Sequence, residues 1–287
     1  MTGVLDKIDY GLMMHGAVVV AGGAYVWNGG GRKDPLRGSP IRANRLTILH
    51  VWVCVAACFL GWSAGGKIGT ALAPADLSGD RLLNWQSCAA AAIANGVIIL
   101  ACLLVAGSAF ARGLRGLGWG RRSLRSDLAW ATAGFLVAVL VVRLLLFALE
   151  WVIETFFRGV RLPEHSVFQV LNDADSGPGI RVVTLAGAFV LAPAGEELLF
   201  RGILQTALRR AVPPRPGSLR HRWWAILVTG LLFGAVHGNT PHYIPALAFL
   251  GVLLGFLYER TGSIRACILV HMLFNGRSLL WDYLAAR

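Results

Sequence analysis

Three separated segments of this sequence carry polar residues in otherwise apolar surroundings, each in a pair of residues four apart. The pairs are Glu197 and Arg201, Phe233 and His237, and His271 and Asn275, with Glu196 directly before the first pair. Residues four apart lie on the same face of a helix, whereas Glu196 is turned away from Glu197 by about 100°. Each pair taken alone could be structural, as a salt bridge, a packing histidine or an amide joining two helices. Together they predict a shared polar site.

The residue types in this set are those needed to hydrolyse a peptide bond without a covalent nucleophile. A carboxylate beside an imidazole can take a proton from water and deliver it to a leaving amine. A second imidazole and a carboxamide can donate hydrogen bonds to the developing oxyanion. Glu196, His237 and His271 could instead ligate a divalent metal. The sequence has no His-Glu-x-x-His motif, so a zincin helix is not indicated.

The charged members of the set lie in a stretch that is hydrophobic enough to enter a membrane. Glu196, Glu197 and Arg201 occur within the apolar run Val182–Leu204. An ionised side chain at the centre of a bilayer costs about 2.5–3.5 kcal/mol on insertion scales. Three such groups so close together therefore need partners, water or a function.

The composition predicts an all-α polytopic membrane protein. Of the 287 residues 56% are hydrophobic and 15% are charged, whereas soluble domains carry about 25% charged residues. Apolar windows of about 20 residues mark transmembrane helices. We expect about eight of them, near residues 10–27, 46–64, 86–111, 129–153, 181–208, 223–240, 243–259 and 264–284.

Basic residues predict how these helices are oriented. Lys and Arg gather in every second connection, in residues 28–45, 112–125, 209–222 and 260–265. Cytoplasmic loops carry this excess, so we expect these four connections on the cytoplasmic side and both termini on the other. The net charge of +12 is thereby explained by membrane topology, and we expect no nucleic-acid partner.

Glycines at regular spacing predict close helix packing. Gly230, Gly234 and Gly238 recur every four residues, as do Gly251 and Gly255. Small residues at this spacing let helix backbones approach closely in lipid. We therefore expect the predicted helices 223–240 and 243–259 to pack tightly beside the polar site.

The three motifs in order resemble those of the type II CAAX prenyl endopeptidase and bacteriocin-processing family (CPBP). The surrounding residues are similar too. Ala192–Gln205 resembles the family's first motif helix, Leu257–Ile264 the turn that precedes its last motif, and Glu164-His165 a common lead-in. The resemblance covers about residues 110–280. It implies a family-variable segment of transmembrane helices at 1–112 and an intramembrane catalytic domain at 113–287, with a conical polar cavity.

The resemblance also implies a role for each residue. Glu196 would be the general base that activates water, assisted by His237. His271 and Asn275 would polarise the scissile carbonyl and hold its oxyanion. Glu197 and Arg201 would form a supporting ion pair, and Phe233 would pack against the cavity. The family has been described both as glutamate proteases and as metalloproteases. We favour metal-free chemistry, and the alternative is a Zn²⁺ ion on Glu196, His237 and His271.

The function expected from this resemblance is endoproteolysis within a membrane. The substrate would be a membrane-associated peptide or protein, such as a bacteriocin-like precursor, and the lipid bilayer would be the other partner. The abundance of Arg, Ala and Gly favours a bacterial cytoplasmic membrane as the location. One alternative is a catalytically idle scaffold or bacteriocin-immunity protein of the same fold. A proton-coupled transporter is less favoured, because the polar motifs occupy only the C-terminal half.

Overall fold

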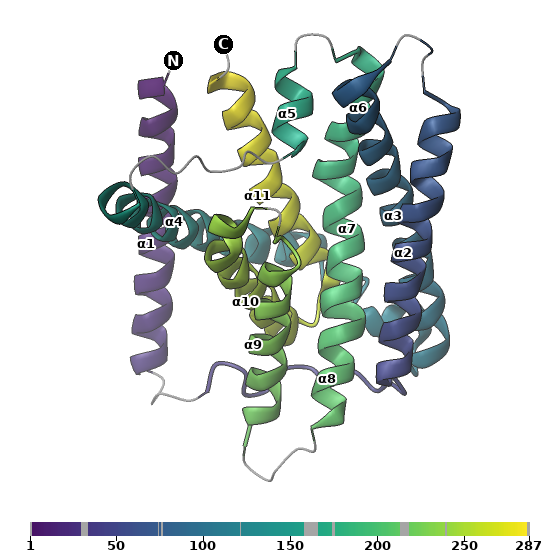
Figure 1. Cartoon of the computed structure of the whole chain (residues 1–287). Helices are drawn as coiled ribbons and strands as arrows, with labels where there is room; N and C mark the ends of the chain where they lie inside the picture. Colours follow the sequence, from purple (N-terminus) through teal and green to yellow (C-terminus); the bar gives the residue numbers. More distant parts are fainter. Residues whose placement is uncertain are drawn as a thin grey trace.

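The computed structural model describes residues 2–29, 34–73, 75, 77–120, 122–157, 166–173, 176–212, 218–238 and 240–285. The predicted all-α class is confirmed, because the regular structure in these ranges is helical (Figure 1). Within these ranges, extended residues pair through an isolated β-bridge between Asn44 and Phe110. Residues 30–33, 121 and 213–217 of the predicted basic connections, and the Glu164-His165 lead-in, lie outside the described residues.

A helix occupies the place of each predicted transmembrane segment. The helices are α1 (Thr2–Gly29), α2 (Ile48–Ala71), α3 (Gly79–Ala109), α4 (Leu124–Phe156), a continuous helix over Pro178–Ala211, α9 (Arg220–Ala235), α10 (Ile244–Thr261) and α11 (Ile264–Ala285), with the shorter η1 (Gly113–Leu117), α5 (Ser166–Asn172) and η4 (Pro241–Tyr243) between them. Five are long and apolar enough to cross a bilayer by length and composition: 48–71, 79–109, 124–156, 178–211 and 241–261. The protein is therefore an integral membrane protein of the polytopic helical kind.

The continuous helix 178–211 contains two π-helical segments. It begins as α6 (Pro178–Ala186), widens into the π-helical η2 (Gly187–Leu191), returns to α in α7 (Ala192–Glu197), widens again in η3 (Leu198–Gln205) and ends as α8 (Thr206–Ala211). The predicted carboxylates thus lie in a short α-helical piece between two π segments. Such segments often occur at functional sites, and nothing in the hydrophobic pattern indicated them.

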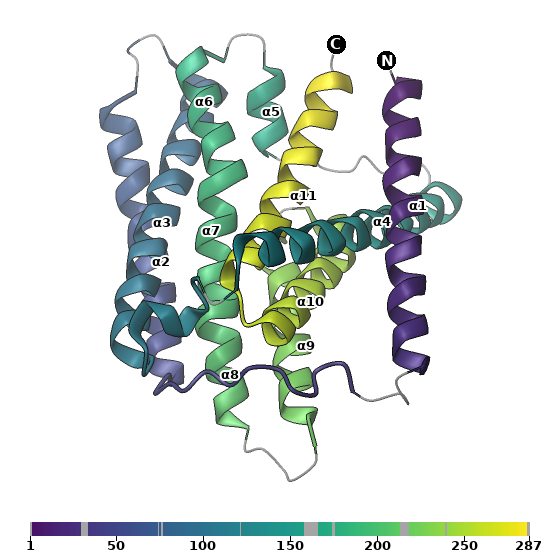
Figure 2. The same ribbon diagram turned by 180° about the vertical axis from the view of Figure 1, so that it is seen from behind.

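The described parts of the four basic connections lie towards the lower end of the molecule, whereas the start of α1 and the end of α11 lie at the upper end (Figures 1 and 2). Residues 34–47 run across the lower end, where the Arg45 backbone N–H donates to Ala109 at 2.7 Å and the Ala111 N–H to Ala43 at 3.1 Å. At the same end Gly118, with φ of 88°, approaches Gly262 so closely that a Cβ would overlap its carbonyl oxygen. This arrangement is the alternation of connections that the sequence predicted.

Helix α4 crosses the molecule at a steep inclination to α1, α2 and α3, from the lower end of the bundle towards α1 (Figure 2). It packs against α1, α10 and α11. Its small residues Ala131, Gly134 and Ala138 face this contact, and a Cβ at Gly134 would lie 2.7 Å from Leu257. The chain thereby brings α10 and α11, which carry or adjoin the polar motifs, against a common support.

The predicted packing of α9 on α10 is confirmed for four of the five glycines. A Cβ at Gly251 would lie 2.8 Å from the Gly230 backbone, and one at Gly234 would lie 2.7 Å from the Ile244 carbonyl oxygen. Gly255 meets Gln205 and Ile226. Gly238 lies beyond the end of α9, because this helix stops at Ala235 rather than at the predicted residue 240. Gly238 and Pro241 disfavour a continued helix there.

Candidate active site

Three helices bring the predicted site residues together. Glu196 and Glu197 lie on α7 and Arg201 on η3; His271 and Asn275 lie on α11; Phe233 is in the last turns of α9 and His237 in the turn that follows. The helices α7 and α11 are in contact, and η3 packs on both α9 and α11. The shared site predicted from spacing is therefore present as a cluster of side chains.

Phe233 lies at the centre of this cluster. Its side chain is completely buried. Its ring centroid lies 5.1 Å from the His237 ring, 5.6 Å from the His271 ring and 5.2 Å from the Phe200 ring. Edge-on and tilted aromatic contacts at these distances are favourable and directional. Phe233 thus contacts both imidazoles, that of His237 and that of His271.

Glu197 is the buried member of the glutamate pair. Its Oε2 lies 3.2 Å from Arg201 Nε, and both side chains are inaccessible to solvent. Arg201 also donates from Nη2 to the Gly251 carbonyl at 3.0 Å, and its guanidinium lies 4.8 Å from the Phe233 ring centroid. A buried charge is tolerated only when it is paired and hydrogen-bonded in this way. The geometry therefore gives Glu197 a fixed, structural position.

His271 joins the two glutamates. Its Nδ1 lies 3.0 Å from Glu197 Oε1, and its Nε2 lies 3.9 Å from Glu196 Oε2. An ionised Glu197 can only accept, so Nδ1 carries the proton and Nε2 faces Glu196. The Glu196 side chain remains 27% exposed, and its Oε2 has no hydrogen-bond partner among the described residues. Adjacent positions on α7 thus hold one locked carboxylate and one that is accessible.

His237 is oriented by its own backbone. Its Nδ1 lies 2.7 Å from the Phe233 carbonyl oxygen, which only accepts, so Nδ1–H donates and Nε2 takes no part in this bond. The backbone N–H of His237 donates to Gly234 at 3.1 Å. The sequence predicted that His237 lies within the helix. It lies instead in the turn that follows the end of α9.

Asn275 has a partner that follows from the winding of the long helix. In η2 the Ala192 N–H donates to Gly187, five residues back. The next bond of this kind would come from Pro193 to Ala188, but proline has no N–H. Asn275 Nδ2 donates to that Ala188 carbonyl at 2.9 Å instead. One of its two amide hydrogens is thereby used to join α11 to η2, and the other remains.

The arrangement of the candidate ligands bears on the zinc alternative. Among the described residues, no group of three or more His, Cys, Asp and Glu side chains is placed to hold a metal ion. Glu196 and His271 come near each other, and His237 and His271 both contact the Phe233 ring. The donor set as arranged does not fit a closed metal site, and the metal ligands predicted from the sequence stay a prediction.

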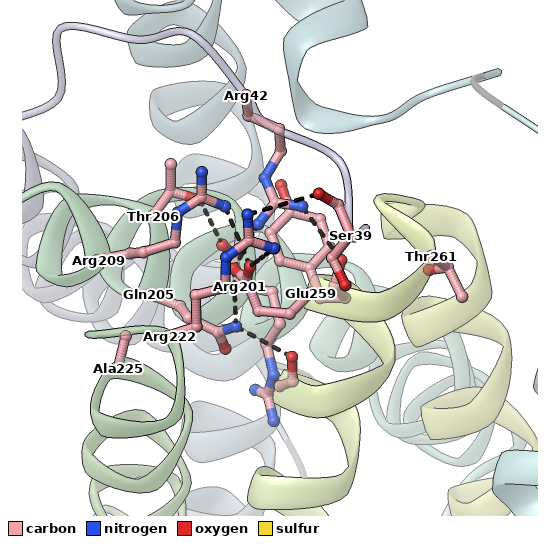
Figure 3. Close-up of polar contacts among 12 residues, drawn as sticks. Ser39, Arg42, Arg201, Gln205, Thr206, Arg209, Arg222, Ala225, Glu259 and Thr261 are labelled. Carbon is pink, nitrogen blue, oxygen red and sulfur yellow. Dashed lines mark hydrogen bonds and ion pairs between the residues drawn. The ribbon is translucent and has the colours of Figure 1, made fainter. Parts of the chain in front are cut away.

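A second polar cluster, which sequence reasoning missed, surrounds Glu259 at the basic end (Figure 3). The Glu259 carboxylate is fully buried and lies 2.5 Å from Arg42, 3.0 Å from Arg209 and 3.8 Å from Arg222. Gln205 Nε2 lies 3.5 Å from it and donates to the Gly255 carbonyl at 3.0 Å. The four charged residues come from the 34–47 connection, α8, α9 and α10. The cluster therefore ties the basic end together below the candidate site.

The arginines of this cluster had been interpreted only as cytoplasmic loop charges. Arg42 and Arg222 are in fact buried, and the Arg42 guanidinium lies 3.9 Å above the Tyr258 ring while donating to the Tyr258 carbonyl at 3.1 Å. The available signal was Glu259, an acidic residue at the end of an apolar helix beside three basic connections. Its partners are remote in sequence, so pattern alone did not identify them.

Part of the chain matches a known family. Residues 178–277 match the family model described as type II CAAX prenyl endopeptidase Rce1-like, and this segment carries all three polar motifs. The predicted resemblance is confirmed over this segment. No solved structure matches the chain significantly.

Two curated relatives match over part of their length. One, from Bacillus subtilis (strain 168), bears the name "Putative membrane peptidase YdiL" and is 26% identical over 153 residues, which are 53% of this chain and 55% of the relative. The other, from Escherichia coli, is an uncharacterized 24.3 kDa protein that is 31% identical over 126 residues, 43% of this chain and 55% of the relative. The chain thus spans about half the length of these relatives. Both the family model and the first relative bear the name of a peptidase.

Proposed function

We propose that this protein is an intramembrane endopeptidase that hydrolyses a peptide bond in a membrane-associated peptide or protein, with Glu196 activating the water. One observation carries this proposal. His271 lies between a locked carboxylate, 3.0 Å from Glu197, and an accessible one, 3.9 Å from Glu196. A purely structural pair would not need a second carboxylate that is partly exposed while its Oε2, the oxygen nearest His271, is buried without a hydrogen-bond partner.

The charges of the cluster support a particular protonation state. Glu196 and Glu197 contribute two negative charges and Arg201 one positive charge. With His271 as an imidazolium the four groups sum to zero, whereas a neutral His271 leaves an uncompensated negative charge in an apolar surrounding. The imidazolium donates from Nδ1 to Glu197 and presents Nε2–H beside Glu196. That N–H is the donor a developing oxyanion requires.

Hydrolysis then proceeds through two proton transfers. Glu196 takes a proton from water as the water oxygen bonds to the carbonyl carbon, and His237 orients the water through its free Nε2. Nε2–H of His271 and the remaining amide hydrogen of Asn275 bind the oxyanion. Glu196 then gives the proton to the leaving nitrogen as the C–N bond breaks, which releases an amine and a carboxylic acid.

The roles of the remaining residues follow from their contacts. Arg201 pairs with Glu197, and Glu197 in turn orients His271 through Nδ1. Phe233 keeps both imidazoles in place. These are positioning residues, and the conical cavity that would admit the substrate beside Glu196 stays a prediction. We propose the bacterial cytoplasmic membrane as the location, since the basic connections lie at one end.

Reconstituted cleavage tests this function. The full chain in liposomes is incubated with a library of membrane-associated peptides, and products are read by mass spectrometry. General-base catalysis contributes about 10²–10⁴ in rate, so Glu196→Gln should abolish detectable cleavage. The exposed carboxylate of Glu154 on α4 provides a matched control, and Glu154→Gln should leave cleavage unchanged.

The same assay separates the alternatives. Cleavage by Glu196→Gln at the wild-type rate would rule out the mechanism. Loss of cleavage with a chelator and recovery with Zn²⁺ would replace water activation by metal chemistry. If the folded wild type cleaves no peptide of the library, whereas a proton flux depends on Glu196, the transporter is favoured. The absence of both activities favours the idle scaffold or immunity protein.

A further inference from the structure

Two adjoining hollows lie on the side of the molecule away from the candidate active site. The larger, of about 970 Å³, runs between α1, α4 and α10 and is lined by apolar residues such as Val19, Val137 and Phe256. The smaller, of about 270 Å³, lies beside the 34–47 connection and is lined by Gly38, Pro40, Arg122, Trp130, Arg260 and Thr261. Trp130 and Arg260 belong to both hollows. They therefore form one continuous depression with an apolar part and a polar part.

The apolar part exists because α1 and α10 both rest on α4, which crosses between them (Figure 2). Gly22 and Gly23 of α1 leave space in the trough because they have no side chains. A Cβ added at either residue would meet no other atom within 4 Å. An apolar trough of this kind, open along its side, matches a hydrocarbon chain. A trough of this volume suits an acyl chain better than it suits a compact ligand.

The polar part carries positive charge without a matching carboxylate. Arg260 and Arg37 line the depression, and neither has an ion pair within the described part of the chain. Arg122 donates from Nε to Ser126 at 2.9 Å. The acidic residue nearby, Asp34, already accepts from the Leu36 N–H at 2.8 Å and from Trp223 Nε1 at 3.1 Å. The guanidiniums are thus available to an oxyanion, which arginine binds through paired N–H groups.

The apolar trough joins a basic pocket, and this pocket lies at the end of the fold that carries the basic connections. Together they match the chemistry of one ligand class. We propose that this depression binds an anionic glycerophospholipid, with its phosphate at Arg260, Arg37 and Arg122 and an acyl chain along α4 between α1 and α10. The positive-inside pattern places this end at the cytoplasmic leaflet, which carries the anionic lipids. A free phosphate would use only the small pocket. The proposal does not depend on proteolysis.

Native mass spectrometry of the detergent-solubilised full chain tests the site. We expect retention of dioleoyl phosphatidylglycerol and about tenfold weaker retention of the zwitterionic phosphatidylcholine of the same chains, because its phosphate is the same but its choline places a positive charge beside the arginines. Arg260→Gln should remove this preference, whereas Arg112→Gln, at an exposed arginine of the same end, should keep it. Gly23→Leu fills the trough and should weaken retention of both lipids. Gly11→Leu places the same side chain on α1 where a Cβ meets no atom within 4 Å and outside the trough, and should have no effect.

Equal retention of the two lipids by the wild type would overturn the proposal, as would an unchanged preference in Arg260→Gln. Displacement of the lipid by inorganic phosphate at millimolar concentration, with Gly23→Leu silent, would identify the pocket as a free-phosphate site instead. A dimer that Gly23→Leu dissociates would show that a second copy of the chain occupies the trough. Activity in the liposome assay is not used as a readout, so failure here leaves the proposed protease untouched.

Discussion

Glu259→Gln removes the one carboxylate of a buried cluster that contains three arginines. The carboxylate lies 2.5 Å from Arg42, 3.0 Å from Arg209 and 3.8 Å from Arg222 and is inaccessible to solvent. In the wild type these four groups carry an excess of two positive charges. Glutamine has the same shape but no charge, so three guanidiniums remain next to one another without a counter-charge.

The expected loss of stability is large. Breaking a buried ion pair by removing one partner costs about 3–5 kcal/mol, because the other charge is left uncompensated. For a chain of about this size a loss of 1 kcal/mol lowers Tm by roughly 2–4 °C. We therefore expect Glu259→Gln to lower the apparent Tm by about 6 °C or more. Glu154→Gln removes an exposed carboxylate and should change Tm by less than about 2 °C.

The excess of positive charge also predicts an asymmetry between the partners. Arg222→Gln removes the most distant guanidinium and relieves part of the repulsion, while Glu259 keeps Arg42 and Arg209. Its cost should be less than half that of Glu259→Gln. Unfolding is followed by tryptophan fluorescence in detergent at one fixed scan rate, because membrane proteins often unfold irreversibly. The reasoning fails if Arg222→Gln destabilises as strongly as Glu259→Gln, or if Glu259→Gln is neutral.

Two further changes test the contacts that position the candidate site. Asn275→Ala leaves the Ala188 carbonyl without its donor at 2.9 Å. We expect a loss of about 1–3 kcal/mol in stability and faster amide hydrogen exchange in η2. Unchanged exchange there would contradict the bond. Gly251→Ala places a Cβ 2.8 Å from the Gly230 backbone and should cost about 1–3 kcal/mol by overpacking. Gly96→Ala meets no atom within 4 Å and should raise stability by up to about 1 kcal/mol, measured in the same thermal assay.

The parts that could be predicted from the sequence are those set by local pattern. A run of about 20 apolar residues must be helical in a bilayer, because each backbone polar group needs a partner within the same segment. Spacing of four residues places His271 and Asn275, or Glu197 and Arg201, on one helix face wherever that helix lies. The alternation of basic connections follows in the same way from charge. These predictions needed no knowledge of which helices are neighbours.

The winding of the long helix shows where local pattern is insufficient. Pro193 was visible in the sequence, but helix-breaking residues in membranes are accommodated in several ways. Here the chain widens into η2, and the orphaned Ala188 carbonyl is bonded by Asn275 of α11. Which of these solutions is adopted depends on a helix more than 80 residues away in the sequence.

The sequence by itself determined that the protein is helical and membrane-embedded, that its charges alternate across the membrane, and which polar residues share helix faces. Only the tertiary structure decided which carboxylate is locked and which is accessible. Glu196 and Glu197 are adjacent and chemically identical, and they differ because Glu197 is buried against Arg201 and His271 while Glu196 stays partly exposed. Burial and partners are properties of the packed helices, and no single segment of the sequence contains them.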